Sequence, residues 1–227
     1  MRLNKYLSEK GLCSRREADD WIGSGRVEVN RRIATLGTPV EDGDEVRVDG
    51  RVVSERLQPH VTIAFNKPVG VTCTTEARVR DNIIDFIGHE QRIFPIGRLD
   101  KDSEGLILLT SDGDIVNALL RAEHGHEKEY QVTVDRSITA ATLRDMERGV
   151  PILGTRTLPC KAWQTGPRSF GIVLVQGLNR QIRRMCEHFG YEVVALQRTR
   201  FVNIELGNLK LGYWRHLTPV EMRQLLS

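Results

Sequence analysis

Five charged side chains are concentrated in a short segment near the middle of the chain. Residues 97–105 begin and end with glycine, and between them lie Arg98, Asp100, Lys101, Asp102 and Glu104. The apolar run 106–109 follows at once, and its glycine-bounded pattern predicts a buried strand. A turn in water needs only one or two charged residues, so this density beside a predicted core strand needs an explanation, and a carboxylate placed for base or nucleophilic chemistry is one. A polar loop whose charges face water is the interpretation that the segment by itself favours.

A second candidate is Tyr130, which lies near the start of an alternating segment, 129–134, that predicts a strand. A tyrosine in this position is most often a half-buried core or edge residue. Its functional alternative is a platform on which an extruded nucleic-acid base stacks, with the phenol hydroxyl free to polarise the base or accept a proton.

A third candidate is a set of arginines on a helix predicted near residue 180. An apolar stripe at helical spacing is formed there by Ile182, Met185, Cys186 and Phe189. At about 100° per residue, Arg180 and Arg184 point away from this stripe, whereas Arg183 lies at its border and can reach into a cleft. These arginines either stay in water or, together with Arg198, form a patch that binds nucleic acid.

The first 48 residues predict a small basic module. Helical spacing covers residues 3–9, and Ser14 and Glu17 form a capping box that opens a second helix. Strands are predicted at 27–29 and 46–48. Basic residues gather in the first half of the module, and three of them are candidate phosphate contacts: Arg15, Arg16 and Arg26.

The remainder of the chain predicts an α+β domain with a mainly antiparallel mixed sheet and flanking helices. Residues 49–60 are polar and are interpreted as a linker, so the catalytic domain is expected over 61–227. Strands are expected at 61–65, 71–74, 158–164, 170–175, 192–195 and 201–206. Caps are expected at Asp81, at Asp112 or Asp114, at Thr139 and at Thr218, the last with proline at the first helical position.

Composition excludes several classes of protein. No apolar run reaches the roughly 18 residues that span a membrane, and no signal peptide precedes the module. The 4 cysteines are dispersed without a Cys-x-x-Cys pair, which suits a reducing cytoplasm and predicts no metal site. Since the formal net charge is only +3, an RNA-binding surface has to be a local basic patch.

The motifs resemble two known families. Residues 2–7, 14–18 and 25–30 look like the S4 RNA-binding domain over roughly residues 1–48. Residues 67–70, 97–106, 128–130 and 179–185 resemble the RsuA/RluB/RluE/RluF group of pseudouridine synthases, and segments 126–130 and 175–191 look most like its RluF branch. One departure concerns the C-terminus: RluF-type proteins can carry a long basic tail, whereas this chain stops at Ser227.

The resemblance implies an isomerase that detaches uracil from ribose C1′ and rejoins it through C5 without a cofactor. It implies Asp100 as the catalytic carboxylate, Arg183 as its ionic partner and Tyr130 as the base-stacking residue. Arg98 would fill the gap left by the flipped nucleotide. The implied partner is large-subunit ribosomal RNA, with a transfer RNA as a further candidate, bound by a cytoplasmic monomer.

Three alternatives remain at this point. A non-catalytic RNA-binding or ribosome-assembly protein would use the basic module and the arginine helix without chemistry. A glycosidase-like enzyme would release free uracil instead of rejoining it. A synthase of the same group could also act on small-subunit ribosomal RNA.

Overall fold

The computed structural model describes residues 1–53, 59–120 and 125–227. The chain forms two compact units. The first comprises Met1–Val61 with the short segments Glu90–Arg92 and Ser111–Gly113, and the second comprises the remaining residues. Each unit has its own hydrophobic core.

The N-terminal unit packs two helices, α1 (Leu3–Glu9) and α2 (Arg15–Gly23), against an antiparallel sheet. The sheet has the order β2 (Arg32–Ile33), β1 (Val27–Val29), β3 (Val46–Val48) and β4 (Arg51–Val52). The predicted capping box is confirmed, because Ser14 Oγ accepts a hydrogen bond from the Glu17 amide at 3.1 Å and Glu17 accepts one from the Ser14 amide at 2.6 Å.

The segment expected to be a linker begins as part of this unit. Strand β4 pairs with β3, and Val53 is buried in the core of the unit. Sequence periodicity misses β4 because a two-residue edge strand is too short to show alternation. Residues 54–58, in the middle of the expected linker, lie outside the described residues.

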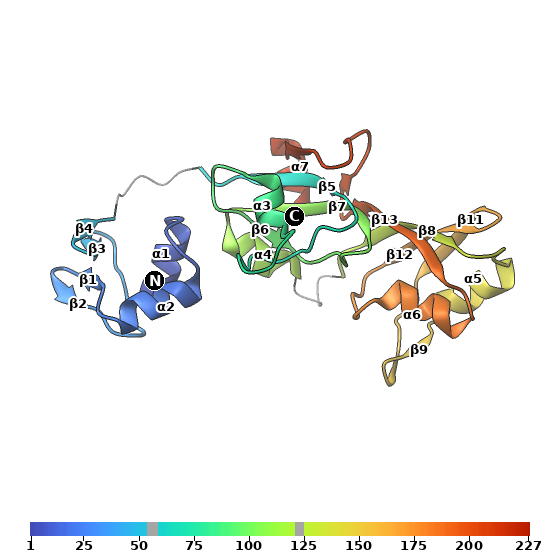
Figure 1. Ribbon diagram of the computed structural model, residues 1–227, viewed down its shortest axis with the longest axis horizontal. Coiled ribbons are helices and arrows are strands. Elements are labelled where there is room, and N and C mark those ends of the chain that lie inside the picture. Colours follow the sequence, from blue (N-terminus) through green and yellow to red (C-terminus); the bar gives the residue numbers. More distant parts are fainter. Residues whose placement is uncertain (54–58, 121–124) are drawn as a thin grey trace. The chain divides into compact units, whose positions relative to one another are not determined.

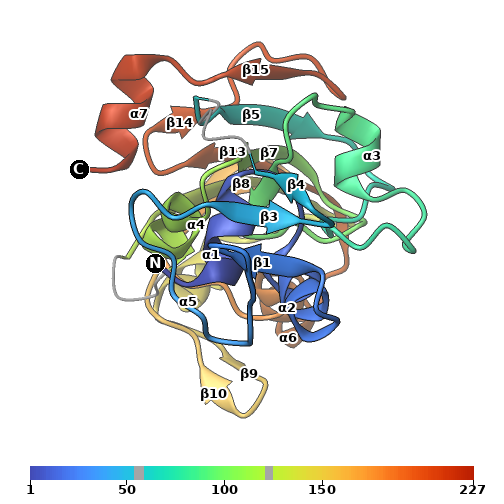
Figure 2. The ribbon, with the colours of Figure 1, turned by 90° about the vertical axis from the view of Figure 1, so that its left-hand side faces the viewer.

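The second unit is built on one large sheet, which confirms the predicted α+β class (Figure 1). Its main path runs β11 (Lys161–Gly166), β12 (Ser169–Leu174), β8 (Lys128–Val134), β13 (Val193–Phe201), β7 (Glu104–Thr110), β5 (Thr62–Lys67) and β15 (Trp214–His216). Two further strands pair off this path, β6 (Phe94–Ile96) with β7 and β14 (Ile204–Glu205) with β13. All of these pairs are antiparallel except β7 with β13. Figure 2 shows β15 beside β5 at the outer edge.

Helices cover the sheet in two groups. The helices α5 (Ala140–Glu147) and α6 (Gln181–His188) pack on β8, β12 and β13 in one apolar cluster. The helices α4 (Gly113–Leu120) and α7 (Pro219–Leu225) pack on β5, β6 and β7 in another. A short helix, α3 (Ile83–Ile87), and a small hairpin of β9 (Pro151–Ile152) and β10 (Thr155–Arg156) complete the unit.

Several sequence predictions need correction. Residues 71–74 form no strand but a single bridge from Thr72 to Asn82, and Asn82 caps α3 in place of Asp81. The two strands expected near 192–195 and 201–206 are one long strand, β13, followed by β14. Polar residues such as Gln197 and Arg198 hide the alternation of β13, because their burial depends on partners in other strands.

Candidate active site

The charged segment is the connection between strands β6 and β7. Antiparallel pairing of Phe94 with Thr110 and of Ile96 with Leu108 brings the two ends of the loop together. Three hydrogen bonds then hold the loop: Ser103 N to Asp100 O at 3.1 Å, Gly70 N to Lys101 O at 2.8 Å and Leu99 N to Cys73 Sγ at 3.4 Å. Asp100 therefore lies in a turn that is tied at both ends.

Gly105 is required where this loop enters the sheet. Its φ of +102° lies in the region that favours glycine, and it pairs with Arg198 of β13 in parallel register. A Cβ atom at Gly105 would lie 2.4 Å from the Arg198 carbonyl oxygen, which is closer than real Cβ contacts come. The absence of a side chain lets β7 and β13 meet beside Asp100.

A cleft of about 1340 Å³ opens on the face of the sheet that carries α4 and α6. Its wall includes the loop residues Arg98, Asp100 and Lys101 together with the start of α6 at Arg180. Its floor includes Tyr130 and Lys128 from β8 and Arg198 from β13. The structure thus brings Asp100, Tyr130 and Arg98 into one cavity, although they come from different strands and loops.

The cation that pairs with Asp100, among the described residues, is Arg180. Its Nη1 lies 3.8 Å from Asp100 Oδ2, while the same guanidinium donates a fork of two hydrogen bonds to Asp102, at 3.2 and 3.1 Å. Burial raises the pKa of Asp102, but the hydrogen bonds from Arg180 and the charge of Arg183 outweigh it and lower that pKa overall. Asp102 is therefore ionised at neutral pH.

Arg183 is placed differently from the expectation that it would pair with Asp100. It is buried, and it donates to the carbonyl oxygen of Asp102 at 2.8 Å and to that of Val193 at 3.1 Å. Its Nε lies 3.5 Å from the Asp102 carboxylate. Arg183 thus reaches the loop between β6 and β7, as its border position on α6 predicted, but it contacts Asp102 and not Asp100.

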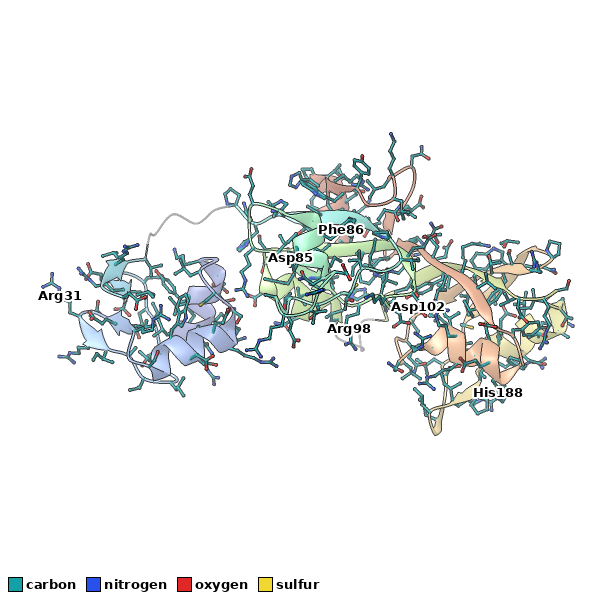
Figure 3. All side chains as sticks on the ribbon, in the orientation of Figure 1. Arg31, Asp85, Phe86, Arg98, Asp102 and His188 are labelled. Atoms are coloured by element: carbon teal, nitrogen blue, oxygen red, sulfur yellow. The ribbon has the colours of Figure 1, made fainter. Side chains whose placement is uncertain are left out.

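The helical projection misplaced Arg180 for a physical reason. Arg180 is the N-cap of α6, with φ of 50°, and not a residue of the helix itself. A rotation of 100° per residue does not apply to a residue with left-handed backbone, so its side chain turns back toward the loop. Figure 3 labels Asp102, where loop and helix meet.

The remaining arginines of the predicted set are distributed over different environments. Arg98 is exposed and lines the cleft (Figure 3). Arg184 donates to the Asn179 carbonyl oxygen at 3.1 Å and does not line the cleft. Arg198, expected in a surface patch, is 2% exposed and belongs to the floor of the cleft.

The candidate phosphate contacts of the N-terminal unit differ in availability. Arg15 and Arg16 are exposed at the start of α2. Arg26 is engaged by its own unit, because it donates to both oxygens of Asp49, at 2.9 and 2.6 Å, and lies over the ring of Trp21. Their binding to RNA stays a prediction.

Two buried lysines near the site were not assigned a role from the sequence. Lys67 is fully buried and donates to the carbonyl oxygens of Pro68 and Val71, both at 2.9 Å, and its burial lowers its pKa. Lys128 is half-buried in the cleft floor. The quoted motifs contain both residues, but only the tertiary structure reveals that neither side chain points to open water.

The described parts of the chain contain neither a cluster of side chains that could bind a metal ion nor a helix that could span a membrane. No group of three or more His, Cys, Asp or Glu side chains within 1–53, 59–120 and 125–227 could hold a metal ion. No helix within the same ranges is long and apolar enough to cross a membrane.

Comparison with known proteins agrees with this geometry. Residues 61–188 match the family model described as RNA pseudouridylate synthase, and residues 1–46 match the S4 domain. The chain is 58% identical over 228 residues to the dual-specificity RNA pseudouridine synthase RluF of Escherichia coli K12, covering 100% of this chain and 79% of that protein. It is 36% identical to the ribosomal large subunit pseudouridine synthase B of Bacillus subtilis, covering 99% and 95% of the two chains.

A solved structure supports the same relationship. The crystal structure of a pseudouridylate synthase superimposes with a TM-score of 0.72 at 26% sequence identity, covering 99% of each chain. Because the family model matches more than half of the chain and the relatives match its whole length, the protein belongs to the S4-domain-containing RsuA/RluB family of RNA pseudouridine synthases, which are isomerases.

Proposed function

We propose that this synthase isomerises a uridine in large-subunit (23S) ribosomal RNA and also a uridine in a transfer RNA. The support is the names of its relatives, one a dual-specificity RNA enzyme and one a ribosomal large subunit enzyme. A target in a loop or bulge is favoured, because flipping a base out of an intact duplex costs a few kcal/mol more.

The catalytic group in this proposal is Asp100, and the observation that carries it is the shared cleft of Asp100, Tyr130 and Arg98. Asp100 acts on the ribose, either as nucleophile at C1′ or as base at C2′, while the glycosidic bond breaks. Tyr130 stacks on the uracil and takes part in the removal of the C5 proton. Arg98, exposed at the mouth of the cleft, occupies the space left in the RNA stack.

Arg180 and Arg183 act on the loop that carries Asp100. Arg180 Nη1 lies 3.8 Å from Asp100 Oδ2, so its positive charge attracts the carboxylate and helps to hold it in the cleft. Arg183 holds the loop from behind through the Asp102 carbonyl oxygen and Ser103 Oγ. We assign Arg180 the electrostatic role and Arg183 the positioning role.

The decisive variant is Asp100→Asn, which keeps the shape of the side chain and removes its charge. We expect it to abolish pseudouridine formation while the dissociation constant for RNA changes little. Carbodiimide treatment followed by reverse transcription maps the product, in cells with and without the protein. A variant that still forms pseudouridine would refute the role of Asp100, and Asp145→Asn, at an exposed position of α5, is the matched control.

The same samples test the glycosidase alternative. Isomerisation leaves the mass of the RNA unchanged, whereas hydrolysis releases free uracil and leaves an abasic site. Mass spectrometry of the RNA and of the small-molecule fraction separates these outcomes.

We also propose that residues 61–227 act as the catalytic domain, that residues 1–48 act as an RNA-binding module, and that the protein works as a cytoplasmic monomer. The cytoplasmic location is supported by the proposed substrates, because ribosomal and transfer RNA are present in the cytoplasm. The four cysteines are free, as suits a reducing compartment. Light scattering at micromolar concentration tests the oligomeric state, and a mass of two chains would contradict it.

A further inference from the structure

The floor of the cleft contains a buried hydrogen-bond donor without an acceptor. Arg198 is 2% exposed, and its Nε donates to the Leu106 carbonyl oxygen at 2.6 Å. Its Nη2 is also buried but has no hydrogen-bond partner. A guanidinium has only donors, and buried donors are nearly always satisfied, so an acceptor that the protein does not supply is expected here.

A second cation lies next to this donor. The Lys128 ammonium donates to the His126 carbonyl oxygen at 3.0 Å and lies 5.9 Å from the centre of the Phe201 ring, over which the Arg198 guanidinium also lies. Burial, and then the charge of Arg198, lower the pKa of Lys128. Neither side chain forms an ion pair with a carboxylate of the described residues, so this part of the floor favours an electron-rich acceptor.

The position of this cation pair relative to the candidate catalytic residues narrows the choice of acceptor. Arg198 is the direct cross-strand partner of Tyr130, so their side chains lie next to each other on the same face of the sheet. Asp100, Tyr130, Lys128 and Arg198 line the same cleft. A base stacked on Tyr130 would have its edge close to Arg198.

We propose that Arg198 donates a hydrogen bond to a carbonyl oxygen of the target uracil and that Lys128 reinforces this contact. The inference rests on the proposed function, because it requires the base to enter this cleft. A phosphate oxygen of the RNA offers similar acceptor chemistry, but the buried, floor-level position next to Tyr130 favours the base.

The contact would also act on the reaction. When the N1–C1′ bond breaks, its electron pair stays with the base, and the negative charge is shared by N1, O2 and O4. On one route an Asp100 carboxylate oxygen forms a bond to C1′, and this bond breaks when C5 bonds to C1′. On the other route C2′ gives its proton to Asp100, which leaves a C1′=C2′ double bond, and C2′ takes the proton back when C5 bonds to C1′. On both routes C5 then loses a proton and N1 gains one. A hydrogen bond donated to O2 or O4 is therefore stronger when the detached uracil carries the negative charge than when the uracil is neutral in the substrate.

The test combines protein variants with substrates that carry sulfur in place of one uracil oxygen. Sulfur accepts hydrogen bonds poorly, so 2-thiouridine or 4-thiouridine at the target position weakens any contact to that atom. Single-turnover rates are measured for the full-length protein and for Arg198→Gln with the oxygen substrate and with both thio substrates. This is a double-mutant cycle between the protein and the base.

We expect Arg198→Gln to lower the single-turnover rate about 10- to 100-fold on the oxygen substrate. For the unchanged protein, one of the two thio substrates should react more slowly than the oxygen substrate. For Arg198→Gln, that thio substrate and the oxygen substrate should react at the same rate, because the contact is already lost. Effects that multiply for both thio substrates would overturn the proposal. A weaker RNA affinity with a salt slope smaller by about 1 would instead identify a phosphate contact and would also overturn it.

Two further variants keep the result interpretable. Lys128→Gln removes the second cation without touching the Arg198–Leu106 hydrogen bond, and it should show the same pattern with a smaller effect if Arg198→Gln fails to fold. Arg148→Gln, at the exposed residue that caps the C-terminus of α5, makes the same change of charge away from the cleft and should leave the rates unchanged. If the unchanged protein forms no pseudouridine at all, the proposed function fails; if it is active and the cycle is additive, only this inference fails.

Discussion

Asp102 is the carboxylate with the most arginine contacts in the candidate site, although its side chain is 47% exposed. It accepts the fork from Arg180 and lies 3.5 Å from Arg183 Nε, while its carbonyl oxygen accepts from Arg183 Nη2. Only Lys101 separates it from Asp100 along the chain. Asp102 therefore determines where Arg180 lies, and through Arg180 it determines the field at Asp100.

Replacing Asp102 tests this arrangement at the residue scale. We expect Asp102→Asn to lower the rate of pseudouridine formation about tenfold, because Arg180 loses its charged anchor near Asp100. Stability should fall by less than about 1 kcal/mol, since partly exposed ion pairs contribute little to folding. Chemical denaturation and single-turnover kinetics measure the two effects separately. Asp102→Glu should recover part of the rate, and an unchanged rate in Asp102→Asn would contradict the role.

At the scale of elements, the C-terminal helix α7 shows how one carboxylate can secure a whole segment. Glu221 accepts from the Thr218 amide at 2.7 Å as part of a capping box, and it accepts two hydrogen bonds from Arg215 of β15, at 2.9 and 2.7 Å. Arg215 first, and the cap second, overcome the opposing effect of burial and lower the pKa of Glu221 from 4.5 to about 2. The helix is thereby fastened to an edge strand of the sheet.

The pKa of Glu221 predicts a pH dependence of stability. Because the folded-state pKa is depressed, the stabilisation is fully present above pH 4.5 and is lost as the pH falls from 4.5 toward 2. It amounts to at most about 3 kcal/mol, and less to the extent that Arg215 is solvated. Glu221→Gln should therefore be less stable than the unchanged protein at pH 7, and the difference in free energy of unfolding should shrink near pH 2–3.

Urea unfolding at several pH values measures this difference. Glu205→Gln is the matched control, because Glu205 is exposed on β14 and forms no ion pair in the described part of the chain. A stability gap for Glu221→Gln that stays constant down to pH 2 would contradict the linkage.

At the scale of the whole molecule, we propose that RNA recognition is divided between two units of different character. The N-terminal unit offers exposed arginines at the start of α2, whereas the second unit offers a cleft with the candidate catalytic residues. Exposed arginines contact phosphates and raise affinity, but they do not touch the reacting base. Changes in the N-terminal unit should consequently affect binding and not the chemical step.

The paired change Arg15→Gln and Arg16→Gln tests this division. We expect a weaker affinity for RNA and a salt dependence whose slope falls by roughly 1 for each lost phosphate contact. The rate at saturating RNA should stay the same. Arg26→Gln should weaken binding less, because Asp49 already occupies its guanidinium. Filter binding at several salt concentrations provides the affinities, and a fall in the saturated rate would argue against the division.

Local signals account for the elements that the sequence predicted well. The capping boxes at Ser14 and Thr218, the threonine cap at Thr139 and the apolar stripe of α6 all depend on residues within one or two turns. The strand β7 was also recognisable, because a short apolar run between polar loops is typical of a strand buried in the core. Short strands such as β4, β6, β9 and β15 were missed, since strands of 2 or 3 residues are too short to show alternation.

The sequence by itself determined the family, the two-part organisation, and the loop, strand and helix that carry Asp100, Tyr130 and Arg183. Only the tertiary structure decided which arginine pairs with Asp100 and that Arg198 is buried at the cleft instead of lying on a surface. The physical reason is the range of the interactions. A helix cap is determined within four residues, but the contact of Asp102 with Arg180 spans 78 residues and exists only where the fold brings the loop before β7 and the start of α6 together.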